Sequence, residues 1–138
     1  MYPAELVAPM SKDLTDFGFS SLTSSDEVTE LMNKEEGTFL LVINSVCGCA
    51  AANARPGAKI SLTNEKRPEK CYTVFAGVDK DATEKAREFL LPYPPSSPAI
   101  ALFKEGKLVH FLERHHIEGR SAEIIAQNLM MAYDHFCE

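Results

Sequence analysis

Two cysteines separated by one glycine are the residues of this chain whose types and spacing most directly suggest chemistry. Cys47, Gly48 and Cys49 follow an apolar run, TFLLVIN at 38–44, and precede an alanine-rich stretch. An apolar run without polar alternation is typical of a strand buried on both faces, and alanine favours a helix. We therefore expect the pair at the carboxyl end of a buried strand, where the sites of open α/β sheets collect.

The start of a helix would make these thiols reactive. Its unpaired N–H groups and partial positive charge stabilise a thiolate, which lowers a thiol pKa from about 8.5 by one to several units. We assign Cys47 as the nucleophile and Cys49 as the resolving cysteine. A disulfide between them needs a tight turn, which Gly48 permits, and so small a ring is expected to be strained and easily reduced.

Two other interpretations of the pair stay open. The cysteines could be incidental core residues, because free cysteines are often buried. They could also supply two soft ligands for zinc or copper(I). His115 and His116 would then be the further ligands, with Cys71 behind them. The spacing matches no familiar zinc signature, so we expect neither a bound metal nor a bound cofactor.

The rest of the chain supplies the elements that would position the pair. Apolar periodicity and caps predict helices at 3–16, 25–34, after the cysteines with a break at Pro56, from Asp79 onward and at 121–136. Strands are predicted at 38–44 and 71–77, followed by a hairpin of 99–106 and 107–112. The expected apolar faces of the first and last helices are Leu6, Val7, Met10, Leu14 and Phe17, and Ile124, Ile125, Leu129, Ala132 and Phe136.

A β-α-β unit, a helix, a hairpin and a final helix is the element order of the thioredoxin fold. We therefore predict an α/β protein with a central mixed sheet, extra N-terminal helices and a single domain over 1–138. The first two strands are expected to be parallel, joined by a right-handed crossover. The hairpin would add antiparallel pairs at the sheet edge.

Two further segments are candidate parts of the site. Ser97–Pro98 precedes a predicted strand, and in the thioredoxin fold a cis-proline there faces the active cysteine, so we favour a cis bond. The charged run at 113–120 is either a solvated loop or an anion-recognising patch formed by Arg114, His115, His116 and Arg120.

Other polar and thiol residues are weaker candidates. Asn44 and Asn53 flank the pair, whereas Arg55 is expected to lie too far along the helix to contact it. Cys71 is expected in the core, and Cys137, beside the terminus, is expected to be exposed.

Composition narrows the class of protein. A net charge of −6 argues against a nucleic-acid partner. No window approaches the roughly 20 apolar residues of a membrane span, and the first residues do not have the form of a secretory signal. We therefore expect a cytoplasmic protein, whose four cysteines are unlikely to form a structural framework. The sequence leaves the oligomeric state open.

Four segments make the chain resemble the bacilliredoxins, thioredoxin-like proteins with a CGC active site. They are VINSVCGCAAANARPGA (42–58), TVFAGVDKDAT (73–83), PSSPAIALFKEGKLV (95–109) and HHIEGR (115–120). The chain lacks the Trp-Cys-Gly-Pro-Cys motif of thioredoxin and contains no tryptophan.

This resemblance implies a function. Bacilliredoxins reduce mixed disulfides between proteins and bacillithiol, a small thiol built from glucosamine, malate and cysteine. Cys47 would take over the bacillithiol, and either Cys49 or a second bacillithiol would complete the cycle. The implied partners are bacillithiolated or disulfide-containing proteins, with bacillithiol as co-substrate. General disulfide exchange or isomerisation is the alternative activity. Because the malate of bacillithiol is an anion, the resemblance also favours the patch at 114–120 as an anion-binding site.

Overall fold

The computed structural model describes residues 2–33 and 36–138. Within these residues, five helices longer than one turn surround a sheet of five strands, together with a π-helical turn and one short helix. The elements are α1 (Ala4–Thr15), β1 (Ser20–Ser21), α2 (Ser25–Asn33), β2 (Thr38–Asn44), η1 (Ala50–Ala54), α3 (Arg55–Ser61), β3 (Lys70–Phe75), α4 (Lys80–Glu88), β4 (Ala99–Lys104), β5 (Lys107–Leu112), α5 (Arg114–Ile117) and α6 (Ala122–Phe136). Residue 34, the predicted end of the second helix, lies outside the described residues.

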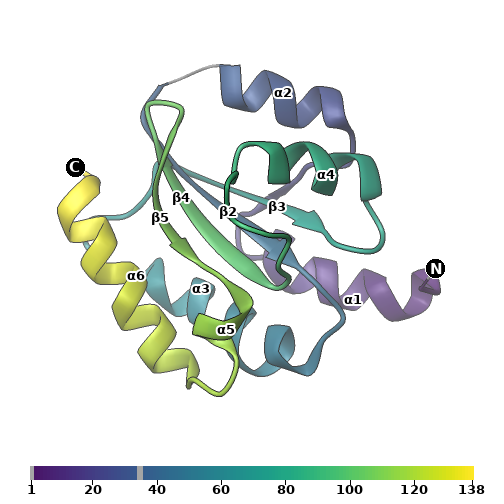
Figure 1. Ribbon diagram of the computed structural model, residues 1–138. Helices are drawn as coiled ribbons and strands as arrows, with labels where there is room; N and C mark the ends of the chain where they lie inside the picture. The colour runs from purple at the N-terminus through teal and green to yellow at the C-terminus, as the bar shows by residue number, and fades with distance from the viewer. Residues whose placement is uncertain (1, 34–35) are drawn as a thin grey trace.

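The sheet has the mixed topology that the sequence predicts (Figure 1). Its strand order is β1-β3-β2-β4-β5, with β2 parallel to β3 and antiparallel to β4. The predicted hairpin of β4 and β5 closes one edge. β1, a two-residue strand that the sequence analysis missed, pairs in parallel with β3 at the other edge.

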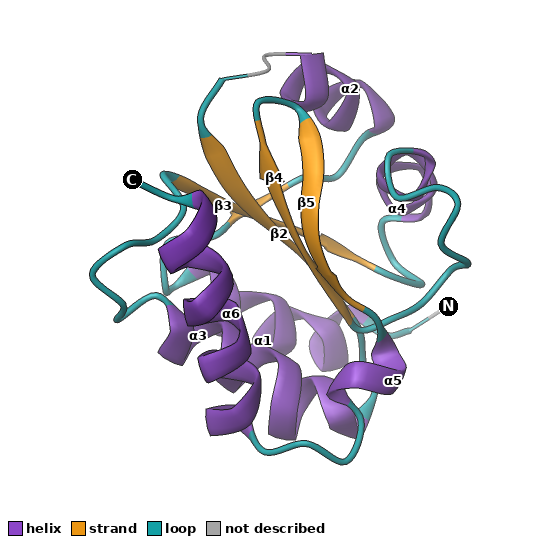
Figure 2. Cartoon of the chain, turned by 60° about the vertical axis from the view of Figure 1, so that its left-hand side comes forward, coloured by secondary structure: helices purple, strands orange, loops and turns teal. Residues whose placement is uncertain are grey.

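Helices cover both faces of the sheet, which explains why β2 is buried throughout (Figure 2). Leu40 and Val42 point into the core shared with α1, α3 and α6, and Leu41 and Ile43 point into the core shared with α2 and α4. Because successive strand side chains face opposite sides, a strand between two helical layers has no position for an exposed polar residue.

Local sequence signals account for the ends and the packing of several helices. Before α2, the Glu27 side chain accepts the backbone N–H of Ser24 at 3.1 Å, and the Ser24 hydroxyl accepts that of Glu27 at 3.2 Å, as the predicted capping box requires. Gly18, at φ +97°, ends the first helical segment as predicted. A Cβ at Gly57 would lie 2.7 Å from Ile125 Cγ2, so glycine there lets α3 and α6 approach closely.

The predicted apolar faces need three corrections. Leu6 and Phe17 on the first segment and Ile124 on α6 are about half exposed. The core therefore takes a narrower stripe of each helix than the periodicity suggested. Cys137 is also buried rather than exposed, because the end of α6 packs against the core. No helix within residues 2–33 and 36–138 has the length and apolar character that crossing a bilayer demands.

Candidate active site

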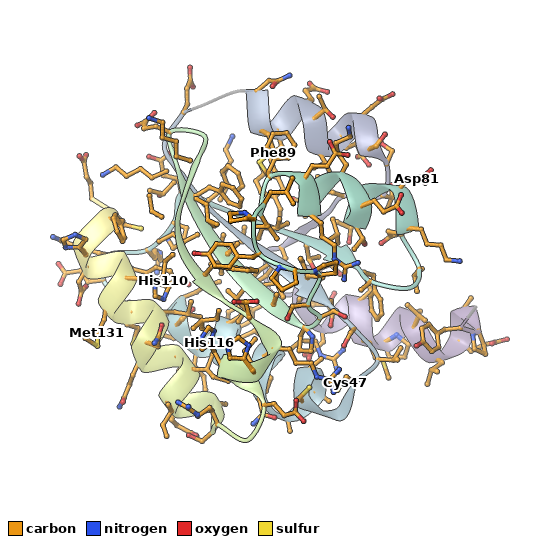
Figure 3. All side chains as sticks on the ribbon, viewed as in Figure 1. Cys47, Asp81, Phe89, His110, His116 and Met131 are labelled. Atoms are coloured by element: carbon orange, nitrogen blue, oxygen red, sulfur yellow. The ribbon has the colours of Figure 1, made fainter. Side chains whose placement is uncertain are left out.

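Cys47 lies in the turn between β2 and the helical segment that follows it. Its carbonyl accepts the N–H of Ala50 at 3.0 Å and that of Ala51 at 3.4 Å, and its own N–H donates to Ser45 Oγ at 3.2 Å. The residue therefore stands at the first turn of the helix, as predicted. Figure 3 places Cys47 at the same end of the molecule as His116 of α5.

The two thiols contact each other and differ in acidity. Cys47 Sγ and Cys49 Sγ are 2.7 Å apart. Hydrogen bonds from the Cys49 side chain and backbone lower the pKa of Cys47, with a smaller contribution from the positive charge of Arg114. Burial, and then the hydrogen bond and charge of Cys47, raise the pKa of Cys49. Cys47 is therefore the more acidic thiol of the pair.

Gly48 joins the thiols in a way that the sequence did not predict. It is exposed and is not among the glycines with positive φ, and a Cβ built on it would meet open space. The thiols thus approach each other within an ordinary right-handed helical turn.

Arg114 links three parts of the site although it is 67 residues from Cys47. Its Nη2 donates to Cys47 Sγ at 3.2 Å, and its Nη1 donates to the Ser97 carbonyl at 3.3 Å. Its Nε pairs with Glu118 Oε2 at 3.2 Å, one helical turn further on. The guanidinium is thereby held against the sulfur by groups on both sides.

The loop before β4 lies beside the thiols and contains the predicted cis-proline. The Ser97–Pro98 bond is cis, as expected, and Leu91–Pro92 is a second cis bond. Ser96 Oγ accepts the backbone N–H of Arg114 at 2.6 Å. Since Ser97 also accepts from the Arg114 side chain, the loop and α5 are held together at the site.

The charged run at 113–120 is not a loop throughout, because residues 114–117 form α5 with Ile117 buried beneath. Of its four candidates, only Arg114 contacts a thiol. The His116 ring accepts the backbone N–H of Glu113 through Nδ1 at 3.0 Å and caps the helix. His115 lines a groove, and the carbonyl of Arg120 accepts a hydrogen bond from Asn53.

The geometry does not assemble the metal site that the sequence left open. Among the described residues, Glu113, His115 and His116 are the group whose ligand atoms come close together, within 4.8 Å of one another. Neither cysteine of the pair belongs to that group. Cys71 packs against the core around α6, and burial raises its pKa to about 12.

A buried hydrogen-bond network behind the pair was missed by the sequence analysis. Asn44 Oδ1 accepts the N–H of Ser45 at 2.8 Å and Arg55 Nη1 at 3.3 Å. Asn44 Nδ2 and Arg55 Nη1 both donate to the carbonyl of Met10, at 3.1 and 3.3 Å. Arg55 does not contact the thiols, as predicted. Its hydrogen bonds instead hold the turn that carries the thiols against α1. The one sequence signal for this network was a charged residue, Arg55, in an alanine-rich helix.

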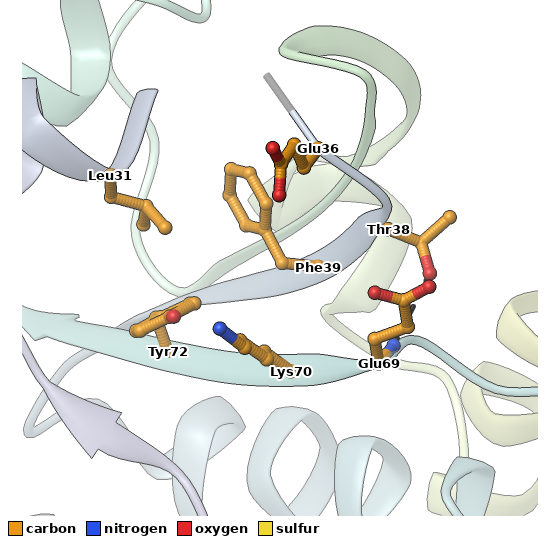
Figure 4. A pocket seen from close by; sticks show the side chains of 7 residues that line it. All are labelled: Leu31, Glu36, Thr38, Phe39, Glu69, Lys70 and Tyr72. Carbon is orange, nitrogen blue, oxygen red and sulfur yellow. Dashed lines mark hydrogen bonds between the residues drawn. The ribbon is translucent and has the colours of Figure 1, made fainter. Parts of the chain in front are cut away.

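Two of the hollows among the described residues lie at opposite ends of the sheet. A groove of about 440 Å³ is lined by the 94–97 loop, Arg87 and residues of α5, among them Arg114. A smaller cavity of about 80 Å³ lies among α2, β2 and β3, with Phe39, Glu69 and Tyr72 in its wall (Figure 4). Neither hollow is lined by a thiol, but Arg114, which lines the groove, donates to Cys47 Sγ, so the groove is the hollow that lies beside the cysteine pair.

Comparison with known proteins identifies close relatives along the whole chain. A family model described as disulphide isomerase matches residues 2–137. A bacilliredoxin of Cytophaga hutchinsonii is 62% identical over 97% of this chain and 98% of its own length. A bacilliredoxin of Halalkalibacterium halodurans is 52% identical over 99% and 95%.

Solved structures confirm the predicted fold. A protein described as having a thioredoxin fold superimposes with a TM-score of 0.62, at 18% identity, over 80% of this chain and 92% of its own. Oxidised thioredoxin O2 of Arabidopsis thaliana gives a TM-score of 0.57 at 14% identity, over 86% and 96%. At such low identity the likeness concerns the fold alone.

Proposed function

Because the chain belongs to the bacilliredoxin family and is a thiol–disulfide oxidoreductase, we propose that it reduces mixed disulfides between proteins and bacillithiol. Cys47 acts as the nucleophile and Cys49 as the resolving cysteine. Bacillithiol is the co-substrate, bacillithiolated proteins are the partners, and the reaction takes place in the cytoplasm.

The exchange proceeds by two displacements at sulfur. The Cys47 thiolate attacks the bacillithiol sulfur of the mixed disulfide, and the protein leaves as its thiolate, which takes a proton from solvent. Cys49 then loses its proton and attacks Cys47 Sγ, which releases bacillithiol and leaves a Cys47–Cys49 disulfide. Alternatively, a second bacillithiol attacks the bacillithiol sulfur of the adduct, which yields bacillithiol disulfide and restores the Cys47 thiolate.

The opposite pKa displacements of the two thiols carry this assignment. A nucleophile must be deprotonated near neutral pH, and the pKa of Cys47 is lowered. A resolving thiol that keeps its proton until the adduct has formed does not compete for the substrate, and the pKa of Cys49 is raised. The 2.7 Å between the sulfurs puts Cys49 in reach of an adduct on Cys47.

The first test is intact mass spectrometry of a Cys49→Ala variant mixed with a bacillithiolated protein. We expect a mass increase of one bacillithiol on the variant and release of the reduced substrate. The Cys47→Ala variant, as the matched control, is expected to gain nothing. If the two variants behave alike, the assigned roles are wrong.

General disulfide exchange or isomerisation is the second candidate, and the description of the matching family model favours it. The same assay separates the two functions. Failure to accept bacillithiol, while an ordinary disulfide still reacts with Cys47, would leave the general exchanger as the function.

A further inference from the structure

Cys47 occupies a position that usually carries an oxygen-bearing side chain, the cap at the start of a helix. Its carbonyl accepts the N–H groups of Ala50 and Ala51, as that of a cap residue does, and helical backbone begins at residue 48. The side chain of a cap residue accepts an N–H group two or three residues further on. Here that acceptor is a sulfur. The pKa of Cys47 is lowered by the hydrogen bond of the Cys49 thiol and then by backbone hydrogen bonds, from Cys49 and from Ala50.

A serine two residues before this cap could have taken the same N–H groups. Ser45 Oγ instead accepts the backbone N–H of Cys47 at 3.2 Å, which is the hydrogen bond of a serine turn. Because the hydroxyl is engaged there, the N–H groups of Cys49 and Ala50 are left to the sulfur. The two side chains therefore divide the N–H groups of the turn between them.

Ser45 is itself fixed by buried neighbours. Its residue surface is only 7% exposed, and its backbone N–H donates to Asn44 Oδ1 at 2.8 Å. Asn44 is 1% exposed, and its amide donates to the carbonyl of Met10 in α1 at 3.1 Å. The hydroxyl that accepts from Cys47 is thus anchored to β2 and α1, on the side of the turn that faces the protein interior.

We propose that Ser45 is a positioning residue for the nucleophile, whose hydroxyl holds the Cys47 backbone so that the sulfur faces the N–H groups at the start of the helix. The proposal rests on the assignment of Cys47 as the nucleophile and adds a residue outside the cysteine pair that supports this role. Ser45 acts through the backbone of Cys47, so the exchange of sulfur bonds is unchanged.

The other groups that act on the Cys47 sulfur come from parts of the site that this hydroxyl does not hold. Cys49 Sγ lies 2.7 Å away, and Arg114 of α5 donates to the sulfur at 3.2 Å. Glu118, which follows α5, pairs with Arg114 Nε at 3.2 Å. We expect all three groups to keep their places when the Ser45 hydroxyl is removed. Only the contribution of the backbone N–H groups is then lost.

The test is the pH profile of iodoacetamide alkylation at Cys47 in a Ser45→Ala variant, read by peptide mass. We expect the rate at pH 7 to fall about two- to tenfold, the range for one hydrogen bond, because a sulfur turned away from the N–H groups is a weaker acid. At a pH above both pKa values the rates of variant and wild type are expected to converge. A merely structural loss would change the rate by the same factor at every pH.

Two further variants make the result specific. Ser45→Thr retains a hydroxyl and is expected to give a profile nearer to that of the wild type than Ser45→Ala does. Ser24→Ala removes a hydroxyl that accepts the backbone N–H of Glu27 at the same distance, 3.2 Å, before α2. It is the matched control and is expected to leave the Cys47 profile in place, whatever stability it loses in urea unfolding.

A Ser45→Ala profile that coincides with that of the wild type, or that lies below it by one factor at every pH, would overturn the positioning proposal. A Ser45→Thr profile no nearer to the wild type than that of Ser45→Ala would do the same. The proposed function would stand in each case. If Cys47 of the wild type is alkylated more slowly than Cys49 near neutral pH, the proposed function itself fails.

Discussion

At the scale of single residues, the site works because two neighbouring thiols of the same type have different surroundings. Cys47 receives hydrogen bonds from Cys49 and lies 3.2 Å from the Arg114 guanidinium. Cys49 lies deeper and faces the charge of Cys47. Since each group stabilises the proton state of the other, the pair loses its first proton from Cys47 at a lower pH than an ordinary thiol does.

Replacing Arg114 by glutamine is expected to make Cys47 less acidic. The change removes a positive charge and a donor to the thiolate, so the pKa of Cys47 moves up toward the ordinary value of about 8.5. Because the guanidinium is partly exposed, we expect a modest effect, a two- to fivefold lower alkylation rate at pH 7. The measurement is the pH profile of iodoacetamide reaction at Cys47, read by mass.

Two further variants make this result specific. Arg114→Lys keeps a positive charge and is expected to retain part of the acidity. Lys107→Gln, at the start of β5 in the hairpin, makes the same change in net charge and is expected to leave the profile in place. A profile that shifts equally in Lys107→Gln and Arg114→Gln would mean that Arg114 acts only through the overall charge of the protein.

At the scale of elements, the sequence predicted best what depends on local pattern. The run at 38–44 identified β2, because a strand between two helical layers is buried at every position and its central residues, 39–43, are all apolar. Glu105 and Gly106 identified the hairpin turn, where both residues have positive φ. The cysteine pair, placed directly after β2, predicted thiol–disulfide chemistry.

What the sequence could not predict depends on contacts between distant elements. Arg114 reaches Cys47 only because α5 forms within a charged run and docks on Ser96 and Ser97. β1 is too short to leave a periodic pattern. Arg55 is a charged residue that becomes buried because α1, a helix outside the β-α-β unit, supplies its partners.

The contact between α1 and α3 gives a prediction at this scale. Arg55 is only 4% exposed, and its Nε lies 3.4 Å from Asp13 Oδ2. Asp13→Asn leaves this buried cation without its counter-charge, so we expect a loss of about 1–3 kcal/mol in the free energy of unfolding, less than for a fully buried pair. Urea unfolding of the wild type and the variant measures the loss.

Asp16→Asn is the matched control, because it makes the same change in charge three residues further along the chain. Its ion pair with Lys12 joins side chains that are 63% and 69% exposed, and such pairs contribute about 0–1 kcal/mol. Equal losses in the two variants would show that the buried Arg55 does not depend on Asp13.

At the scale of the whole molecule, the reactive and the inert thiols lie in different environments. Cys47 and Cys49 are partly exposed beside the groove. Cys137 belongs to the core between the sheet and α6, together with Tyr133, and Cys71 is partly buried and packs against that core. Burial raises the pKa of Cys71 to about 12 and also raises those of Cys137 and Tyr133. Among the four thiols the fold therefore lowers the pKa of Cys47 alone.

This arrangement predicts a loss of stability in alkaline solution. The folded protein holds the proton of Cys71 up to a pKa of about 12, whereas the unfolded chain releases it near pH 8.5. The stabilisation is complete below pH 8.5 and is lost as the pH rises toward 12, because the folded state then binds more protons than the unfolded state. The slope from this thiol is at most about 1.4 kcal/mol per pH unit.

Urea unfolding under reducing conditions, at steps from pH 7.5 to pH 10, measures this slope. In Cys71→Val the group is gone while the repulsion among the remaining charges is the same, so we expect a shallower decline than in the wild type. Tyr133→Phe is expected to change the slope of stability against pH only near pH 10, where an unfolded tyrosine begins to ionise. If Cys71→Val and the wild type lose stability in parallel from pH 8.5 upward, the Cys71 thiol is not held protonated by the fold, and the separation into reactive and inert thiols fails.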